Sequence, residues 1–218
     1  MTTRIIIARH GNTFTKDQTP LRVGARTDLP LVETERGTNI GKYLKMRSLI
    51  PVAVFAAPLK RTTETARLAI AALDKDIPLI SDARFTEIDY GPDEGKTEEE
   101  VIARVGEDAL EAWNANAIVP QGWNVSVDEI IKAWNTFAND VERDYKGKTV
   151  MVVSSNGIIR FAPHLTGNFQ KFSEEFNIKV GTGSVCVLEK EDGDKHWTVK
   201  EWGVKPKDKL SDKLASIA

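Results

Sequence analysis

The sequence predicts an α/β protein of three layers, with helices on both faces of a mostly parallel central sheet. Three apolar runs, at residues 5–8, 52–57 and 149–154, have the unbroken hydrophobic character of strands that are buried on both faces. A polar loop follows each run, and a segment with helical spacing follows the loop, which is typical of parallel sheets. We therefore expect ligands to bind at the carboxyl ends of these strands, where the loops of an open α/β sheet converge.

The remaining elements follow from local signals. Apolar residues at helical spacing predict helices, and Pro51 ends the first of them. Short apolar or alternating runs predict further strands, and the acidic and glycine residues between the last two predict a hairpin turn. The expected elements are a loop over 14–32, a helix over 33–49, a helix from 58 to about Leu73, a strand over 77–80, a helix from 155 to about Gly167, and strands over 183–190 and 196–202 joined by a turn at 191–194.

A long insertion separates two of the predicted strands. Residues 97–145 have helical character and are interrupted by a Pro-Gln-Gly turn at 120–122. We interpret about 85–145 as an acidic loop followed by a helical cap that lies over the crevice at the sheet edge.

Length and composition indicate an ordinary globular protein. The 218 residues are 41% hydrophobic, so we expect one domain over 1–218, with a surface tail over about 204–218. A formal charge of -2 gives no support for a nucleic-acid partner. No apolar run approaches the length of a membrane span, and the single cysteine, Cys186, cannot form an internal disulfide. We expect a cytoplasmic protein with no membrane partner, and its oligomeric state stays open.

The first apolar run ends in a cluster of polar residues, Arg9, His10, Gly11, Asn12 and Thr13. Arg9 is a permanent cation whose planar fork suits phosphate or carboxylate. His10 can be a base, an acid, a metal ligand or a nucleophile, and Gly11 lets the backbone approach a bound group. Asn12 and Thr13 either add hydrogen-bond donors or only fix the loop. The alternative for Arg9 and His10 is that they simply end a strand.

Three further arginines are candidates for contacts with an anion. Arg22 and Arg26 lie in the loop over 14–32, where they either reach a ligand or remain solvated. Arg61 lies in the first turn of a predicted helix, where free backbone N–H groups and the helix dipole favour an anion. Taken alone, an arginine in this position is more often structural.

Four ordered motifs together resemble the histidine phosphatase superfamily, the phosphoglycerate mutase-like proteins. Arg9, His10 and Gly11 are similar to the family's RHG motif, which follows the first strand. The stretch PLKRTTETA over 58–66 resembles a second signature, whose phosphate-clamping arginine corresponds to Arg61. The family's proton-donating glutamate corresponds to Glu87. The resemblance implies a phosphoglycerate mutase-like fold.

The fourth motif contains the largest departure from the family. There the junction reads roughly Val-Ser-His-Gly-Gly-x-Ile-Arg and supplies a second catalytic histidine, whereas residues 152–160 place Ser155 at the histidine position. Asn156 stands where a glycine is common, and asparagine tolerates the left-handed conformation. Both residues are candidate ligand contacts, and the loss of the imidazole predicts slow catalysis.

The resemblance implies phosphoryl transfer through a phosphohistidine. Neutral His10 would attack phosphorus while Arg9 and Arg61 hold the non-bridging oxygens. Glu87 would protonate the leaving alkoxide, and water would then hydrolyse the intermediate. This chemistry needs positioning and positive charge, which arginines can supply.

We therefore expect a metal-independent phosphomonoesterase that acts on a small phosphorylated metabolite. No cofactor is expected, and the three histidines, His10, His164 and His196, do not have metal-ligand spacing. The alternative is a catalytically impaired relative that binds phosphorylated ligands without turning them over. A phosphoglycerate-type mutase ranks last, because the chain is short and lacks the Asn-Glu-Arg stretch of that subfamily.

Overall fold

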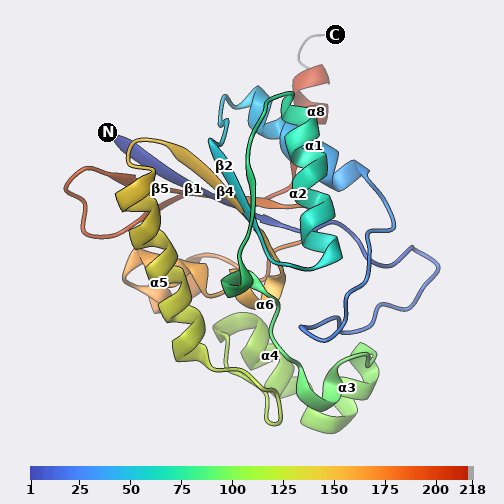
Figure 1. The fold of residues 1–218 in the computed structure, drawn as a ribbon. Helices are drawn as coiled ribbons and strands as arrows, with labels where there is room; N and C mark the ends of the chain where they lie inside the picture. Colours follow the sequence, from blue (N-terminus) through green and yellow to red (C-terminus); the bar gives the residue numbers. More distant parts are fainter. Residues whose placement is uncertain (216–218) are drawn as a thin grey trace.

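The central sheet of the computed structural model, which describes residues 1–215, has six strands in the order β3-β2-β4-β1-β5-β6 (Figure 1). The first four strands of that order run parallel to one another, and β5 and β6 are antiparallel additions at one side. The expected mostly parallel α/β sheet is thus confirmed. The strands are β1 Thr2–Arg9, β2 Ala53–Ala56, β3 Leu79–Ser81, β4 Thr149–Ser154, β5 Val185–Glu191 and β6 Thr198–Val204.

Strand β1 is buried on both of its faces. Ile5 and Ile7 belong to one hydrophobic core, and Ile6 and Ala8 belong to the other. Successive side chains of a strand point to opposite faces, so a strand between two layers of helices needs an unbroken apolar run. The run at 5–8 meets this need.

Helices cover both faces of the sheet (Figure 1). Helices α1 (Glu35–Met46) and α2 (Lys60–Leu73) pack together over one face. Helix α5 (Val127–Asp144) covers the other face, where Phe137 meets the ring of Phe55 edge-on at a centroid distance of 5.0 Å. None of the helices within residues 1–215 is long and apolar enough to cross a membrane.

The position of α5 corrects the expected cap. Helices α3 (Glu98–Val105) and α4 (Glu107–Asn116) form a separate lobe at the lower end of the molecule in Figure 1. Helix α5 instead buries Trp134, Phe137 and Val141 against the sheet. The difference arises because the apolar stripe of α5 is wide and continuous enough to cover a sheet face. The cap is therefore shorter than the predicted 97–145.

Two differences follow β4. The helix expected from 155 to about Gly167 is divided into α6 (Asn156–Ile159) and a 3-10 turn at Ala162–Thr166. Pro163 has no backbone N–H and cannot continue the hydrogen-bond ladder of α6. Helix α7 (Phe169–Glu175) was not predicted, although Asn168 caps it by accepting a hydrogen bond from the N–H of Lys171.

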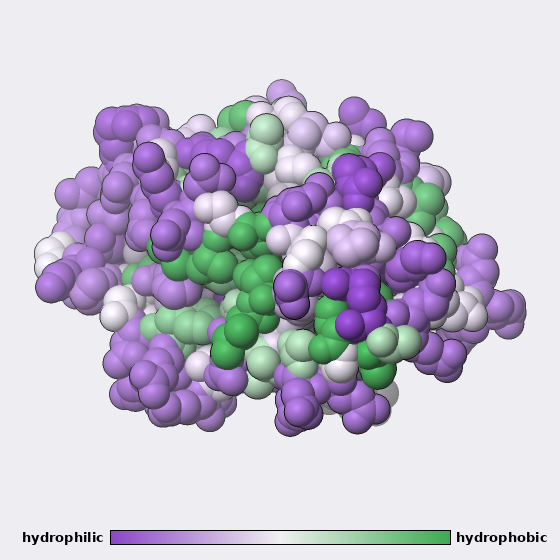
Figure 2. All heavy atoms as spheres, turned by 90° about the horizontal axis from the view of Figure 1, so that it is seen from below, coloured by the Kyte–Doolittle hydropathy of each residue, from purple (hydrophilic) through white to green (hydrophobic). Residues whose placement is uncertain are grey.

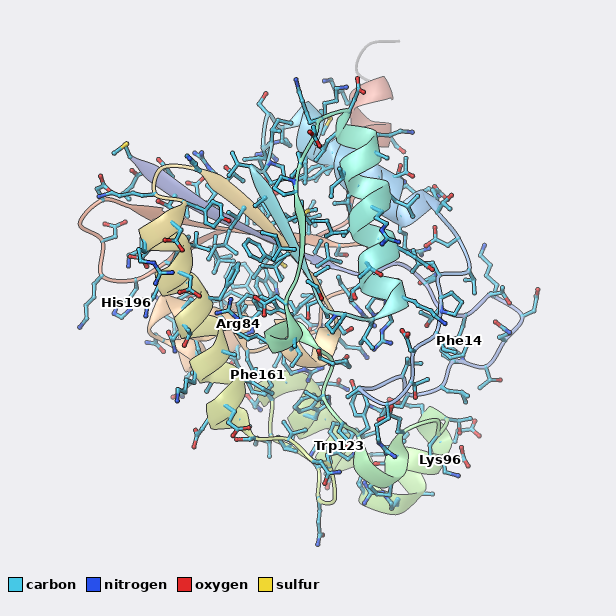
Figure 3. The ribbon with its side chains drawn as sticks, in the orientation of Figure 1. Phe14, Arg84, Lys96, Trp123, Phe161 and His196 are labelled. Atoms are coloured by element: carbon cyan, nitrogen blue, oxygen red, sulfur yellow. The ribbon has the colours of Figure 1, made fainter. Side chains whose placement is uncertain are left out.

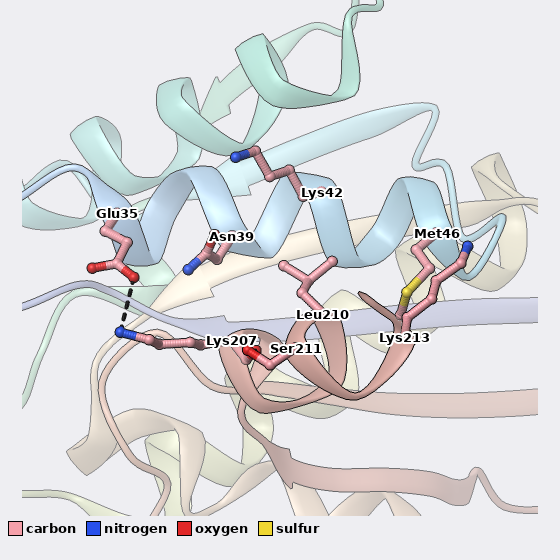
Figure 4. A pocket seen from close by; sticks show the side chains of 8 residues that line it. All are labelled: Glu35, Asn39, Lys42, Met46, Lys207, Leu210, Ser211 and Lys213. Atoms are coloured by element: carbon pink, nitrogen blue, oxygen red, sulfur yellow. Dashed lines mark hydrogen bonds and ion pairs between the residues drawn. The ribbon is translucent and has the colours of Figure 1, made fainter. Parts of the chain in front are cut away.

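The expected surface tail begins as helix α8 (Pro206–Ala215), which packs beside α1 at the opposite end of the molecule from α3 and α4 (Figure 1). Residues 216–218 of the predicted tail lie outside the described residues. A pocket of about 430 Å³ lies between α1 and α8 (Figure 4). At this pocket Lys207 forms an ion pair with Glu35, with an Nζ–Oε1 distance of 3.1 Å. This pocket is remote from the strand ends.

The strand register brings two motifs together. Arg9 of β1 stands opposite Ser154 of the parallel neighbour β4. The residues that follow, His10 and Ser155, therefore leave the sheet side by side at its carboxyl edge. Figure 2 views the molecule from the side of α3 and α4, where hydrophilic residues cover most of the surface and a band of hydrophobic residues crosses the middle.

Candidate active site

His10 lies directly beyond the carboxyl end of β1, and its backbone N–H donates to the carbonyl of Ser154. The residue is only 6% exposed. Its Nδ1 lies 2.7 Å from the carbonyl oxygen of Gly11. A carbonyl only accepts hydrogen bonds, so Nδ1 carries the proton and Nε2 keeps its lone pair. Burial, with the charges of Arg9 and Arg61, holds the pKa of His10 well below its usual value, so the ring is neutral.

Arg9 is the last residue of β1 and directly precedes His10. Its Nη1 donates to the carbonyl oxygen of Val180 at 2.5 Å, which fixes the guanidinium against the loop before β5. Burial lowers the pKa of Arg9, and the charges of Glu87 and Tyr90 oppose that shift. An arginine stays protonated under these conditions because its ordinary pKa is so high. Arg9 thus brings a fixed positive charge to the site.

Arg61 brings a second buried cation from the first turn of α2. Its Nη1 donates to the carbonyl of Thr27 at 2.7 Å, and its Nη2 donates to the carbonyl of Gly24 at 3.2 Å. These bonds tie the loop after β1 to the helix and hold the guanidinium in place. Each Nη atom carries a second hydrogen that these two bonds do not use. The charges of Arg9 and Arg61 both lower the pKa of His10, as expected for cations close to its ring.

Glu87 is a buried carboxylate in the loop after β3. Its Oε1 accepts from the N–H of Ile88 at 2.9 Å. Its Oε2 accepts from the N–H of Gly157 at 3.2 Å and from the hydroxyl of Tyr90 at 3.3 Å. The charge of Glu87 opposes the lowering of the pKa of Arg9 and of Arg61 by burial.

Ser155 and Asn156 begin helix α6 at the same sheet edge. Ser155 is fully buried, and its Oγ has no partner among residues 1–215. Asn156 accepts a hydrogen bond from the N–H of Val180 through Oδ1 at 2.8 Å. Asn156 is the first residue of α6 and has no positive φ, so this position does not use the left-handed conformation that asparagine tolerates. It holds in place the same Val180 whose carbonyl orients Arg9.

The residues after His10 mainly make hydrogen bonds that hold their own loop in place. The N–H of Gly11 donates to Oγ1 of Thr65 at 3.0 Å, and the Oδ1 of Asn12 accepts from the hydroxyl of Thr182. The side chain of Thr13 is partly buried and makes no hydrogen bond with the rest of residues 1–215. These contacts favour a loop-fixing role for Asn12 over direct donation.

The two loop arginines have different surroundings. Arg26 is exposed and donates to Asp89 and to the carbonyl of Gly91, so it ties two loops together and does not join the site. Glu94 accepts from the N–H of Arg26 and the hydroxyl of Thr27, which gives it the same structural role. Arg22 stacks over Tyr90, with its Cζ 5.3 Å from the ring centroid. The hydroxyl of the same tyrosine donates to Glu87.

Sequence reasoning missed two residues of the site. Tyr90 is buried, and burial followed by the charge of Glu87 raises its pKa, so its hydroxyl remains a donor to Glu87. Arg160 is 1% exposed, its Nε donates to the carbonyl of Asn156 at 3.4 Å, and its Cζ lies 3.7 Å from the ring centroid of Trp113. Burial lowers its pKa to about 10. Arg160 belonged to the fourth motif and could have been found there, whereas Tyr90 had no local signal.

Unpaired polar atoms gather around this site. Within residues 1–215, the buried side-chain atoms without a hydrogen-bond partner are Nε of Arg9, Arg22 and Arg61, Oε2 of Glu94, and Oγ of Ser155 and Ser184. Folded proteins leave few such atoms unpaired. Three of these six atoms are guanidinium nitrogens, which only donate, so they indicate a site for a ligand that supplies acceptors, such as an anion. The part of the chain that the structure describes has no group of three or more His, Cys, Asp or Glu side chains arranged to hold a metal ion.

The chain has recognisable relatives among curated proteins. A 2,3-bisphosphoglycerate-dependent phosphoglycerate mutase of Arthrobacter sp. (strain FB24) is 24% identical over 217 residues, which covers 87% of this chain and 88% of that protein. Phosphoglycerate mutase-like protein 4 of Arabidopsis thaliana is 25% identical over 202 residues, covering 91% of this chain and 84% of that protein.

A solved structure and a family model are also similar to this chain. A mycobacterial glucosyl-3-phosphoglycerate phosphatase superimposes with a TM-score of 0.73 at 20% identity, covering 94% of this chain and 100% of that one. The model of the histidine phosphatase superfamily (branch 1) matches residues 5–205. The match spans all the strands except the first residues of β1, together with His10, Arg61, Glu87 and Ser155. The chain therefore belongs to the histidine phosphatase superfamily, branch 1.

Proposed function

We propose that this protein is a phosphomonoesterase that forms a phosphohistidine on His10. The observation that carries this proposal is the state of the imidazole, which is buried, neutral and fixed through Nδ1, so that Nε2 is the free nucleophile. Arg9 and Arg61 flank it with positive charge, and Glu87 lies on the same side of the sheet edge. A nucleophile, an anion clamp and an acid are the groups that phosphoryl transfer requires.

The reaction has two steps. Nε2 of His10 forms a bond to phosphorus, the bond from phosphorus to the ester oxygen breaks, and Glu87 transfers its proton to the leaving alkoxide. Water then attacks the phosphohistidine, gives a proton to the Glu87 carboxylate and releases inorganic phosphate. Arg9 and Arg61 neutralise the charge on the non-bridging oxygens in both steps. No divalent ion is required in this scheme.

Ser155 favours a second candidate function. Its hydroxyl is short and buried, so it supplies less hydrogen bonding and no positive charge to a transferring phosphoryl group at this position. A protein with the intact clamp of Arg9 and Arg61 but weakened catalysis would be a binding protein for phosphorylated ligands. We place slow hydrolysis first because His10 and Glu87 are both held in position. A mutase remains the third candidate, supported only by the names of curated relatives.

The test is hydrolysis of p-nitrophenyl phosphate in the presence of a chelator. We expect turnover in the wild-type protein, none in His10→Ala, and wild-type turnover in His196→Gln. His196 is an exposed histidine (Figure 3) whose ring lies against Gly167, so it serves as the matched control. A rapid alkaline quench should trap phosphate on His10 that is stable in alkali and is released by acid.

Each alternative has its own outcome in this experiment. Undiminished activity in His10→Ala would overturn the proposal, and activity that requires a divalent cation would overturn its metal-free part. If neither protein turns over any ester while both bind inorganic phosphate, the binding protein takes first place. Transfer of the trapped phosphate to a second phosphoglycerate in preference to water would identify a mutase.

A further inference from the structure

Arg61 is oriented by a short turn, residues 24–27, in the loop after β1. Both of its Nη atoms donate to backbone carbonyls of this turn, to Thr27 at 2.7 Å and to Gly24 at 3.2 Å. Because a carbonyl moves only with its own segment, the position of the 24–27 turn decides where the guanidinium of Arg61 points. The residue that holds this turn therefore also controls Arg61.

Glu94 holds the 24–27 turn from the loop before α3. Its Oε1 accepts from the backbone N–H of Arg26 at 2.7 Å and from the hydroxyl of Thr27 at 2.8 Å. A Cβ on Gly24 would lie only 2.6 Å from Oε2 of Glu94, so the turn packs directly on the carboxylate. The Glu94 side chain is 5% exposed. A buried carboxylate is costly to leave without hydrogen bonds, so this contact fixes the turn.

Backbone hydrogen bonds join the same two loops independently of the Glu94 side chain. The N–H of Ala25 donates to the carbonyl of Ile88 at 3.0 Å, and the N–H of Gly95 donates to the carbonyl of Arg22 at 2.8 Å. These bonds do not depend on which side chain stands at residue 94. They should keep the loops together when the carboxylate contact is removed.

Glu94 also brings negative charge close to Arg61. Burial lowers the pKa of Arg61, and the charge of Glu94 is among those that oppose this shift. Oε2 of Glu94 makes no hydrogen bond within residues 1–215, although Nε of Arg26 lies 3.6 Å from it. Only Oε1 holds the turn. A neutral amide at this position could therefore keep both hydrogen bonds and remove the charge, which makes the two contributions separable.

We propose that Glu94 is a positioning residue for the phosphate clamp, and that it orients Arg61 toward the phosphoryl group through the 24–27 turn. The proposal rests on the proposed function, because it takes Arg61 as a ligand of phosphate. Glu94 itself does not bind the phosphate, since a carboxylate repels a dianion. Phosphate affinity should then depend on the hydrogen bonds that Glu94 accepts and not on its charge.

The experiment measures the binding of inorganic phosphate by isothermal titration calorimetry, which does not require turnover. Glu94→Ala should weaken phosphate binding by about tenfold, because Arg61 loses a well-directed charge-assisted hydrogen bond. Glu94→Gln should bind phosphate at least as tightly as the wild-type protein, since its amide oxygen can accept both bonds and the negative charge is gone. In an Arg61→Ala background, Glu94→Ala should have no further effect.

Two further variants separate orientation from stability. Glu100→Ala removes the capping box of α3, so it should lower thermal stability and leave phosphate affinity unchanged. Thr27→Val removes one hydrogen bond to Glu94 and keeps the Thr27 carbonyl on Arg61. It should weaken phosphate binding, by less than Glu94→Ala does. If Glu94→Ala does not fold, Thr27→Val provides the test in its place.

The possible failures have different meanings. Unchanged phosphate affinity in Glu94→Ala and Thr27→Val would overturn the positioning role and leave the clamp intact, as would a full effect of Glu94→Ala in the Arg61→Ala background. Tighter binding in both Glu94→Ala and Glu94→Gln would also overturn it, because the residue would then act only through its charge. Unchanged affinity in Arg61→Ala alone would overturn both the clamp and this proposal.

Discussion

The backbone N–H of Gly157 donates a hydrogen bond to Oε2 of Glu87 across 3.2 Å, and this contact leaves no room for a side chain at residue 157. A Cβ there would lie 2.3 Å from Oε1 of Glu87 and 2.8 Å from Cγ1 of Ile88. The glycine of the fourth motif is thus required by close approach of a carboxylate. It couples α6 to the loop that carries the predicted acid.

The first prediction concerns this contact. Gly157→Ala should displace Glu87 and reduce kcat/KM for alkyl phosphates by at least about tenfold, the loss expected for a misplaced proton donor. Overpacking should also lower the free energy of unfolding by about 1–3 kcal/mol. Steady-state kinetics and urea unfolding measure the two effects. In a Glu87→Gln background the kinetic effect of Gly157→Ala should vanish, and a full effect there would show that the contact acts through another group.

Glu87→Gln tests the acid itself. The amide cannot donate the proton that an alkoxide needs, so hydrolysis of alkyl phosphates should fall by about 10²–10⁴-fold. Hydrolysis of p-nitrophenyl phosphate, whose leaving group needs no proton, should fall far less. Both rates are measured at saturating substrate. Equal losses on the two esters would mean that the proton comes from elsewhere, although Asp89 and Glu94 are already engaged in holding the loops around Arg26.

The buried neutral state of His10 makes stability depend on pH. Its pKa in the folded protein is lowered by burial and by Arg9 and Arg61. The unfolded chain therefore binds a proton at His10 at a higher pH than the folded chain does. The free energy of unfolding should fall as pH decreases from about 6.5 toward the lowered pKa, by up to ~1.4 kcal/mol per pH unit from this one proton.

Urea unfolding at several pH values checks this dependence. His10→Gln removes the proton, so its unfolding free energy should fall less steeply over the same pH range, whereas His196→Gln should follow the wild type. Identical slopes for His10→Gln and the wild-type protein would show that His10 is not held neutral. Bound phosphate must be absent from all samples, because it stabilises the folded state.

Ser155→His should raise the turnover of a generic phosphomonoester at least about tenfold. A preorganised donor to the transferring group is typically worth about 10²–10³ in rate, and tenfold is a conservative share of that. Because Ser155 is fully buried, near-ultraviolet circular dichroism must show that the variant packs normally. Ser173→His on α7 is the control for adding a histidine. A wild-type protein that is already fast, with no gain in the variant, would mean that another residue supplies the donor.

Several features were determined by the sequence itself. The apolar runs of β1, β2 and β4 predicted the parallel part of the sheet, because a strand between two helical layers needs hydrophobic residues on both faces. The sequence also located Arg9, His10 and Arg61, because each lies within or next to the strand or helix that positions it. Local patterns of this kind depend on neighbours in the chain.

Only the tertiary structure decided the features that join distant segments. The position of α5 on the sheet and the break after Ile159 depend on packing and on Pro163. The contacts of Glu87 with Gly157 and Tyr90, and of Arg9 with Val180, bring together loops that are far apart in sequence. Hydrophobic periodicity in the sequence does not predict such pairs, because their geometry follows from strand order and register. For the same reason, the sequence could not distinguish Arg26 from Arg22, four residues earlier in the same loop. Arg26 donates to Asp89, whereas Arg22 stacks on Tyr90.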